Sequence, residues 1–140
     1  MSPEEIAQRS AELIERDDRA SRWLGMTLEE VRPGYARLAM PVAEHMLNAQ
    51  SVCHGGLVFA LADSSFGYAC NTHNQRALAA SCAIEFLAPA HAGDRLTAEA
   101  AEVARSGRSS VYDVRVTNQH RRTIALFRGK AVSVKEAWLE

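Results

Sequence analysis

"HGGLVFALADSSFGYACN", residues 54–71, is the stretch that decides the fold. From Gly55 to about Thr72, apolar side chains occur on most sides of a helical projection, so the pattern predicts a buried central helix of roughly 27 Å. Two features of this helix are costly: the pair Gly55-Gly56 at its start and the acidic Asp63 in its apolar middle. The apolar positions are Leu57, Val58, Leu61, Ala62, Phe66 and Ala69.

The segments on either side of this helix have the periodicities of one further helix and of several strands. Residues 3–23 have apolar side chains near helical spacing behind a helix start signal, Ser2 followed by Pro3. Residues 26–42 predict a β-hairpin that turns at residues 32–35. A meander of antiparallel strands is predicted for residues 77–89, 94–105, 109–119 and 123–134.

This order of elements predicts an α+β fold in which one antiparallel sheet wraps the long helix. The chain has 140 residues, enough for one core, so we expect a single domain over residues 23–140 with an N-terminal helix over residues 1–22. A helix that lies on one sheet leaves the edge of that sheet open. Pairing with a second subunit is the usual remedy, so we expect a dimer.

The composition argues against several classes of function. The formal net charge of -1 gives no indication of nucleic-acid or anionic-membrane binding. No apolar run is long enough to span a bilayer, and the chain starts with acidic and polar residues instead of a secretory signal, so we expect a cytoplasmic protein. The cysteines form no CxxC pair and the histidines lack ligand spacing, so we expect neither a disulfide framework nor a metal site.

The glycine pair and the aspartate together point to chemistry on a carbonyl group. The first N–H groups of a helix lack internal partners, and Gly55 lets another group approach them closely, so this end suits a developing oxyanion. Asp63, poorly solvated among apolar residues, suits attack on a carbon or activation of a water molecule. Close packing of the helix start and a purely structural Asp63 stay open as alternatives.

The distance between these two residues bears on how they can act together. Asp63 lies eight residues beyond Gly55, roughly 12 Å along the helix axis, so one reaction centre cannot touch both groups of one straight helix. If both act on one substrate, they come from different helices. A two-fold dimer with antiparallel helices would place Gly55 of one chain near Asp63 of the other.

Two polar residues precede the helix. Asn48 can donate two hydrogen bonds and stays neutral, so it suits orienting a water molecule or a carboxylate, although it equally suits a turn. His54 stands beside the helix start, where we expect it to hold the loop by a side-chain hydrogen bond; direct action as a base is the alternative.

Two stretches of the chain, NAQSVCHGGLVFALADSSFGYACN and CAIEFLAPAHAGDRLTAEA, resemble the hotdog-fold acyl-CoA thioesterases, in particular the PaaI group of phenylacetic acid degradation. The likeness runs from about Trp23 to the C-terminus. Its most specific part is the pattern of an Asn, His-Gly-Gly six residues later, and then Leu-Ala-Asp. The resemblance implies the hotdog fold, a long helix cradled by a curled antiparallel sheet.

The resemblance also implies roles for individual residues. Asp63 would be the catalytic carboxylate, either as a nucleophile through an anhydride or as a general base for water, and Gly55 would supply the oxyanion amide. His54 and Asn48 would support the site. The family further implies a dimer of dimers and aryl- or phenylacetyl-CoA substrates, including hydroxylated ones, in phenylacetate degradation.

The residues that bind the substrate are less closely defined. Related thioesterases carry a Ser or Thr that faces the site from the strand after the helix, and Ser81 is the candidate here; the contact is missing if Ala79 or Ala83 faces the acyl group instead. We expect no cofactor beyond the coenzyme A of the substrate. Its phosphates are expected to meet exposed cations, with a solvated surface charge as the alternative for each: Arg105, Arg108, Arg128 and Lys130.

Two other functions stay open on the sequence alone. A hotdog acyl-CoA dehydratase or hydratase would have a different pattern, with a His or Glu at the start of the active helix. A non-catalytic acyl-CoA-binding hotdog protein would not need Asp63.

Overall fold

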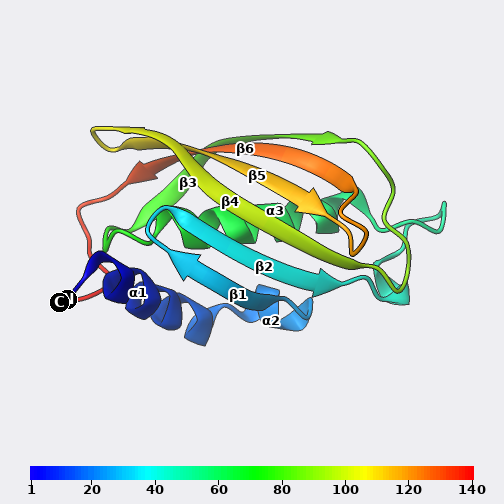
Figure 1. Cartoon of the computed structure of the whole chain (residues 1–140), viewed down its shortest axis with the longest axis horizontal. Coiled ribbons are helices and arrows are strands. Elements are labelled where there is room, and N and C mark those ends of the chain that lie inside the picture. Colours follow the sequence, from blue (N-terminus) through cyan, green and yellow to red (C-terminus); the bar gives the residue numbers. More distant parts are fainter.

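In a computed structural model that describes all 140 residues, a six-stranded antiparallel sheet curls around one long helix (Figure 1). The expected α+β hotdog arrangement is therefore confirmed. The strand order in the sheet is β1-β2-β4-β5-β6-β3. The elements are α1 (Pro3–Asp17), α2 (Arg19–Trp23), β1 (Thr27–Arg32), β2 (Tyr35–Pro41), the short 3-10 helix η1 (Glu44–Met46), α3 (Gly55–Cys70), β3 (Ala77–Phe86), β4 (Arg95–Ser106), β5 (Ser109–Thr117) and β6 (Thr123–Ser133).

The helix α3 is the centre of the hydrophobic core. Eight of its residues are buried, among them Leu61 and Phe66. The hydroxyl of Ser65 lies 3.0 Å from the carbonyl oxygen of Ala36 and 2.9 Å from that of Ala98, so it links α3 to β2 and β4. The apolar pattern of the sequence thus predicts this element correctly, within two residues at its end.

The N-terminal segment departs from the single helix expected over residues 3–23. The helix breaks at Asp18, whose carboxylate accepts hydrogen bonds from the amide of Ser21 and the hydroxyl of Tyr68 at 3.2 and 3.1 Å. These bonds hold Asp18 as the N-cap of α2 and against α3, and no Gly or Pro in the sequence signals the break. None of the helices is long and apolar enough to span a membrane.

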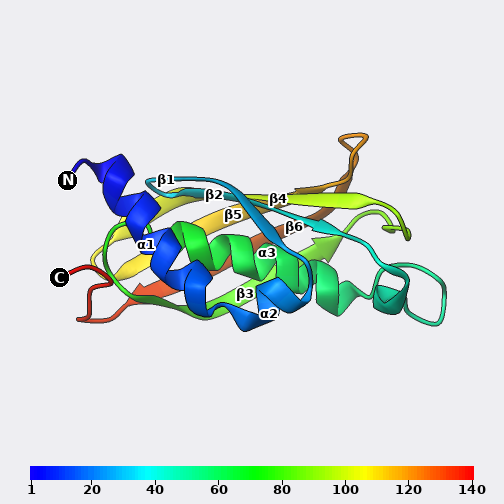
Figure 2. The ribbon, with the colours of Figure 1, turned by 90° about the horizontal axis from the view of Figure 1, so that it is seen from below.

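The topology of the sheet corrects the expected meander. The strands β4, β5 and β6 follow one another through tight turns, but β3 pairs with β6 and not with β4. The two edges of the sheet are therefore β1 and β3. On the β1 side, α1 packs against the strand, and the side-chain amide of Gln8 donates to the carbonyl oxygen of Val31 at 3.0 Å (Figure 2).

The other edge, β3, has no such cover. It is ten residues long and rich in alanine, and most of its side chains are exposed. Leu78 is 65 % exposed and Phe86 is 53 % exposed. A long, exposed apolar edge strand is a template for pairing with another strand, so the open edge expected from the sequence is this one.

Candidate active site

Asp63 lies halfway along α3 and is partly buried. Its side chain makes no hydrogen bond and no ion pair within the chain. Burial raises its pKa above the usual range of an aspartate, because poor solvation disfavours the charged form. A carboxylate in this position, with no compensating partner, costs folding free energy, which is typical of a functional group and unlike a structural one.

The face of α3 that carries Asp63 also carries Phe59, Phe66 and Cys70, because residues three, four or seven positions apart share one side of a helix. This face packs against β6. The ring of Phe59 lies 5.3 Å from that of Phe127, and Phe66 covers Gly129 so closely that a Cβ there would lie 2.7 Å from the ring.

The strand β3, which pairs with β6, also lies near Asp63. Cys82 of β3 pairs with Gly129 and faces α3, and it is only partly buried. Burial raises the pKa of the Cys82 thiol, and the nearby Asp63 carboxylate raises it further. The β3 side chain that lies near the Asp63 carboxylate is thus the thiol of Cys82.

The start of α3 provides an amide with no acceptor. The Nδ1 atom of His54 accepts a hydrogen bond from the amide of Gly56 at 2.9 Å, which makes His54 the N-cap of the helix, as expected. The amide of Gly55 donates no hydrogen bond within the chain. It points from the positive end of the helix dipole, an arrangement that suits a carbonyl oxygen acquiring negative charge.

An apolar cavity of about 330 Å³ adjoins Gly55. Cys53 and Val58 line one side of it, and Phe86 and Ile124 line the other. A Cβ added at Gly55 would lie 3.2 Å from the ring of Phe86, a tight contact, so glycine keeps the space between this ring and the amide open. The cavity offers a site for an apolar acyl group beside the Gly55 amide.

Asn48 holds the loop that leads to α3. Its Oδ1 atom accepts hydrogen bonds from the amides of Gln50 and Val52 at 2.9 and 3.4 Å, which is the turn role weighed for it from the sequence. The side-chain NH₂ group makes no bond within the chain. Asn48 is therefore fixed by its oxygen and retains two donors for a ligand.

The structure separates two of the predicted binding residues from Asp63. Lys130 is exposed between the buried residues Gly129 and Ala131, so it points to the convex face of the sheet, away from α3. Ser81 pairs with Lys130 and shares that face. A β-bulge between Ala79 and Ser81 inserts one extra residue into β3. Ser81 therefore lies on the opposite face of the sheet from the one that strict alternation from Ala79 would give it.

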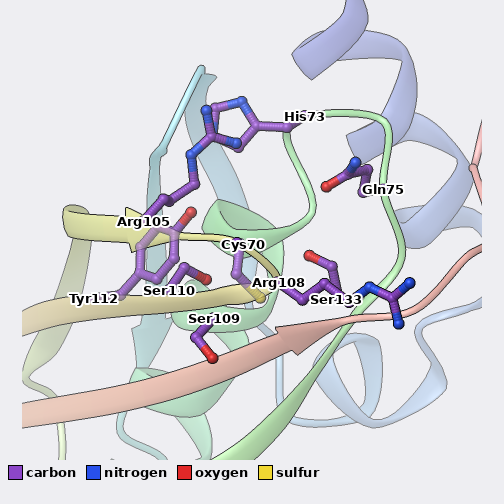
Figure 3. Close-up of a pocket in the computed structure, with 10 residues that line it drawn as sticks. Cys70, His73, Gln75, Arg105, Arg108, Ser109, Ser110, Tyr112 and Ser133 are labelled. Atoms are coloured by element: carbon purple, nitrogen blue, oxygen red, sulfur yellow. The ribbon is translucent and has the colours of Figure 1, made fainter.

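The remaining predicted cations lie elsewhere. Arg128 is paired with Asp113 on the convex face, with Nε 2.6 Å from Oδ1. Arg105 and Arg108 line a polar cavity of about 330 Å³ beyond the C-terminal end of α3 (Figure 3). Separate segments build this cavity, the loop after α3, the β4–β5 turn and the end of β6, so no local pattern in the sequence predicts it.

Comparison with known proteins is consistent with this geometry. Residues 50–125 match the model of a family described as the thioesterase superfamily. The chain is 41 % identical over 125 residues to the acyl-coenzyme A thioesterase PaaI of Escherichia coli, covering 89 % of each protein.

Two solved structures show the same architecture. The PaaI protein from the phenylacetic acid degradation operon of E. coli superimposes with a TM-score of 0.95, at 38 % identity, over 97 % of this chain and 99 % of that one. A substituted form of the phenylacetic acid degradation protein PaaI from Thermus thermophilus gives a TM-score of 0.79 at 36 % identity, over 82 % of this chain and 98 % of that one.

Proposed function

The chain is a thioester hydrolase of the thioesterase superfamily, and from this premise we propose that it hydrolyses aryl- or phenylacetyl-type acyl-CoA to the free acid and coenzyme A. The observation that carries the proposal is the pair of uncompensated groups on α3. Asp63 is a poorly solvated carboxylate without a partner, and Gly55 has an amide without an acceptor. A thioester carbonyl needs one group of each kind.

The two groups act together across a subunit interface in this proposal. They lie about 12 Å apart along one helix, too far to touch the same carbonyl. The uncovered β3 edge favours two-fold pairing with β3 of a second copy, and the α3 helices would then lie side by side and antiparallel. Asp63 of one subunit would face Gly55 of the partner subunit, giving two sites per dimer; two such dimers would form the tetramer implied by the family.

The carboxylate can drive hydrolysis in two ways. As a general base, Asp63 accepts a proton from a water molecule whose oxygen attacks the thioester carbon; the carbonyl electrons move to the oxygen, which the Gly55 amide stabilises. The carbon–sulfur bond then breaks, and the thiolate takes the proton from Asp63. As a nucleophile, Asp63 displaces the thiolate itself, and water hydrolyses the mixed anhydride.

The surroundings of Asp63 and Gly55 indicate the roles of the supporting residues and the chemical class of the acyl group. His54 fixes the helix start, and the free donors of Asn48 orient the water molecule or the carboxylate. The apolar cavity beside Gly55 suits an aromatic acyl group, in keeping with the phenylacetic acid degradation operon of the E. coli relative. No cofactor takes part other than the coenzyme A of the substrate, and the proposed location is the cytoplasm.

Release of free thiol from a panel of aryl and aliphatic acyl-CoAs tests the reaction. We expect thiol release to be fastest with arylacetyl-CoAs. An alkene shift without thiol, or tight binding without turnover, would instead indicate a hydratase or a binding protein.

Mixing inactive subunits tests the shared site. Asp63→Asn removes the carboxylate, and Gly55→Pro removes the amide while keeping a residue that suits the first position of a helix. After exchange in equal amounts, half of the dimers are mixed and each holds one intact site, so about a quarter of the wild-type activity should return. Proven subunit exchange without any recovery would refute the shared site.

A further inference from the structure

The segment that follows β6, residues 134–140, lies against the loop between α3 and β3. In Figure 1 this tail, coloured red, leaves the end of β6 and runs past the end of the molecule at which α3 finishes. It forms no helix or strand of its own. Its contacts with the loop are nevertheless specific, and they are made to Asn71, Asn74 and Arg76.

Arg76 joins the tail to the start of β3. Its amide donates to the carbonyl oxygen of Glu136, and its own carbonyl oxygen accepts from the amide of Val134, both at 2.8 Å. These two bonds continue the pairing of β3 with β6 beyond Ala77, the first residue of β3. The guanidinium group of Arg76 also lies over the ring of Trp138, 4.1 Å from its centroid, which is a cation–π contact. The tail therefore holds both the backbone and the side chain of Arg76.

Trp138 also reaches the end of α3, through the buried amide of Asn71. The Nε1 atom of Trp138 donates to Oδ1 of Asn71 at 2.8 Å, and the same oxygen accepts from the amide of Ala77 at 2.9 Å. The side-chain NH₂ group of Asn71 donates to the carbonyl oxygen of Gly67 at 2.8 Å. Because Asn71 is only 6 % exposed, these bonds take the place of bonds to water. One side chain thus connects the end of α3, the start of β3 and the tail.

A second asparagine fixes the tail by its backbone. Asn74 has a positive φ of 57°, a conformation that asparagine tolerates better than most residues. Its Oδ1 atom accepts from the amide of Leu139 at 2.7 Å, and its Nδ2 atom donates to the carbonyl oxygen of Leu139 at 3.3 Å. This reciprocal pair does not use the Trp138 ring, so the tail has two independent attachments to the loop.

The start of β3 is the part of this strand that most needs such support. The β-bulge between Ala79 and Ser81 interrupts the ladder with β6 and leaves three regular pairs before it, at Ala77, Leu78 and Ala79. On its other side this piece has no strand to pair with, and Leu78 is 65 % exposed. A short piece of edge strand with few contacts opens easily. The tail and Asn71 fix its first residue and thereby hold the exposed edge in place.

We propose that the tail is a strap that holds the start of β3 in position to pair with β3 of a second copy, with Trp138 as a positioning residue. The inference rests on the proposed function, in which pairing of two β3 edges completes each site. Trp138 acts through Asn71 and Arg76 and not on the substrate. A looser start of β3 would weaken the dimer, and a subunit on its own would have no Gly55 amide opposite its Asp63.

Subunit exchange and activity at several protein concentrations test the strap. Trp138→Ala removes the donor to Asn71 and the ring over Arg76, so fluorescently labelled subunits should exchange about tenfold faster than in the wild type. Thiol release per subunit should fall on dilution and return to the wild-type value at concentrations where the dimer is fully formed. Trp138→Phe keeps the ring and should show a smaller effect. Trp23→Ala removes the other tryptophan, which is 77 % exposed, and as the matched control should change neither quantity.

Asn74→Gly is a second variant, which tests the strap even if Trp138→Ala does not fold. Glycine tolerates the positive φ, so this change removes only the bonds to Leu139, and it should also speed exchange. A lowered Tm with unchanged exchange and no dependence of activity on concentration would overturn the proposal, because the tail would then be a purely structural element. A monomeric wild-type protein would overturn the strap together with the shared site. Faster exchange in a protein that releases no thiol from any acyl-CoA would support the strap and refute the proposed hydrolysis alone.

Discussion

Replacing Asp63 by asparagine should reduce activity and increase stability at the same time. The substitution keeps the shape of the side chain but removes the charge, and with it the ability to attack carbon or to accept a proton from water. General-base or nucleophilic action contributes typically about a hundred- to ten-thousand-fold, so kcat for arylacetyl-CoA should fall by that factor. KM should change little, because the apolar cavity beside Gly55 and the Gly55 amide are untouched.

The stability effect follows from the raised pKa of Asp63. Burial makes the folded protein bind this proton more tightly than the unfolded chain does, so the ionised carboxylate destabilises the fold at neutral pH, and the penalty disappears below the pKa of an unfolded aspartate. Since the side chain keeps partial contact with solvent, the penalty is on the order of 1 kcal/mol, or about 3 °C in Tm for a chain of this size. Asp63→Asn should gain this amount at pH 7 and lose the advantage as the pH falls towards 4.

Thiol release and thermal unfolding at several pH values measure both effects. Asp113→Asn is the matched control, since it removes an exposed carboxylate whose pKa is lowered by its hydrogen bond with Arg128. It should keep full activity and lose a little stability, the opposite sign. If Asp63→Asn retains more than about a tenth of the wild-type kcat, Asp63 is not the catalytic carboxylate. A Tm that falls at pH 7 would show that Asp63 is a structural residue.

Three further predictions use other parts of the site. The plot of hydrolysis rate against pH should have its acid midpoint above the pKa of free aspartate, about 3.9, because Asp63 acts ionised and burial raises its pKa; a midpoint below that value would exclude it. Gly129→Ala should destabilise the fold by about 1–3 kcal/mol in chemical denaturation, because the new Cβ would lie 2.7 Å from the ring of Phe66, which is 1 % exposed and cannot yield; unchanged stability would contradict this packing. Gly55→Ala keeps the backbone N–H but adds a Cβ beside it, 3.2 Å from the exposed ring of Phe86, so we expect near-normal thermal unfolding with a kcat lowered at least tenfold because the Cβ obstructs the approach of the carbonyl; normal kcat would contradict the need for a glycine at this amide.

Local periodicity was sufficient to predict most elements of the fold. The apolar run beginning at Gly55 marks α3, and the alternating runs mark the strands, because burial on one face or on all faces leaves a repeat in the sequence. The break at Asp18 has no such repeat, since it depends on the contacts of Asp18 with Ser21 and Tyr68. The pairing of β3 with β6 is likewise a long-range property that no local pattern encodes.

The candidate binding residues show why the sequence predicts only part of the geometry around Asp63. Asp63, Gly55 and His54 lie on one helix, so spacing along the sequence determines their geometry. Ser81 is different, because a β-bulge just before it changes which side chains of β3 face α3, and bulges of this kind have no reliable sequence signal.

Three costs borne by the isolated chain have a common explanation. The β3 edge exposes apolar side chains, Asp63 has a carboxylate without a partner, and Gly55 has an amide without an acceptor. Each feature is unfavourable for a single subunit. No rearrangement within that subunit relieves all three, because packing in the core fixes the helix α3. In the proposed dimer, pairing of two β3 strands would cover the edge and would bring the carboxylate of one α3 helix to the amide of the other. A thioester bound there would supply what both groups lack, an electrophilic carbon for the first and a developing oxyanion for the second.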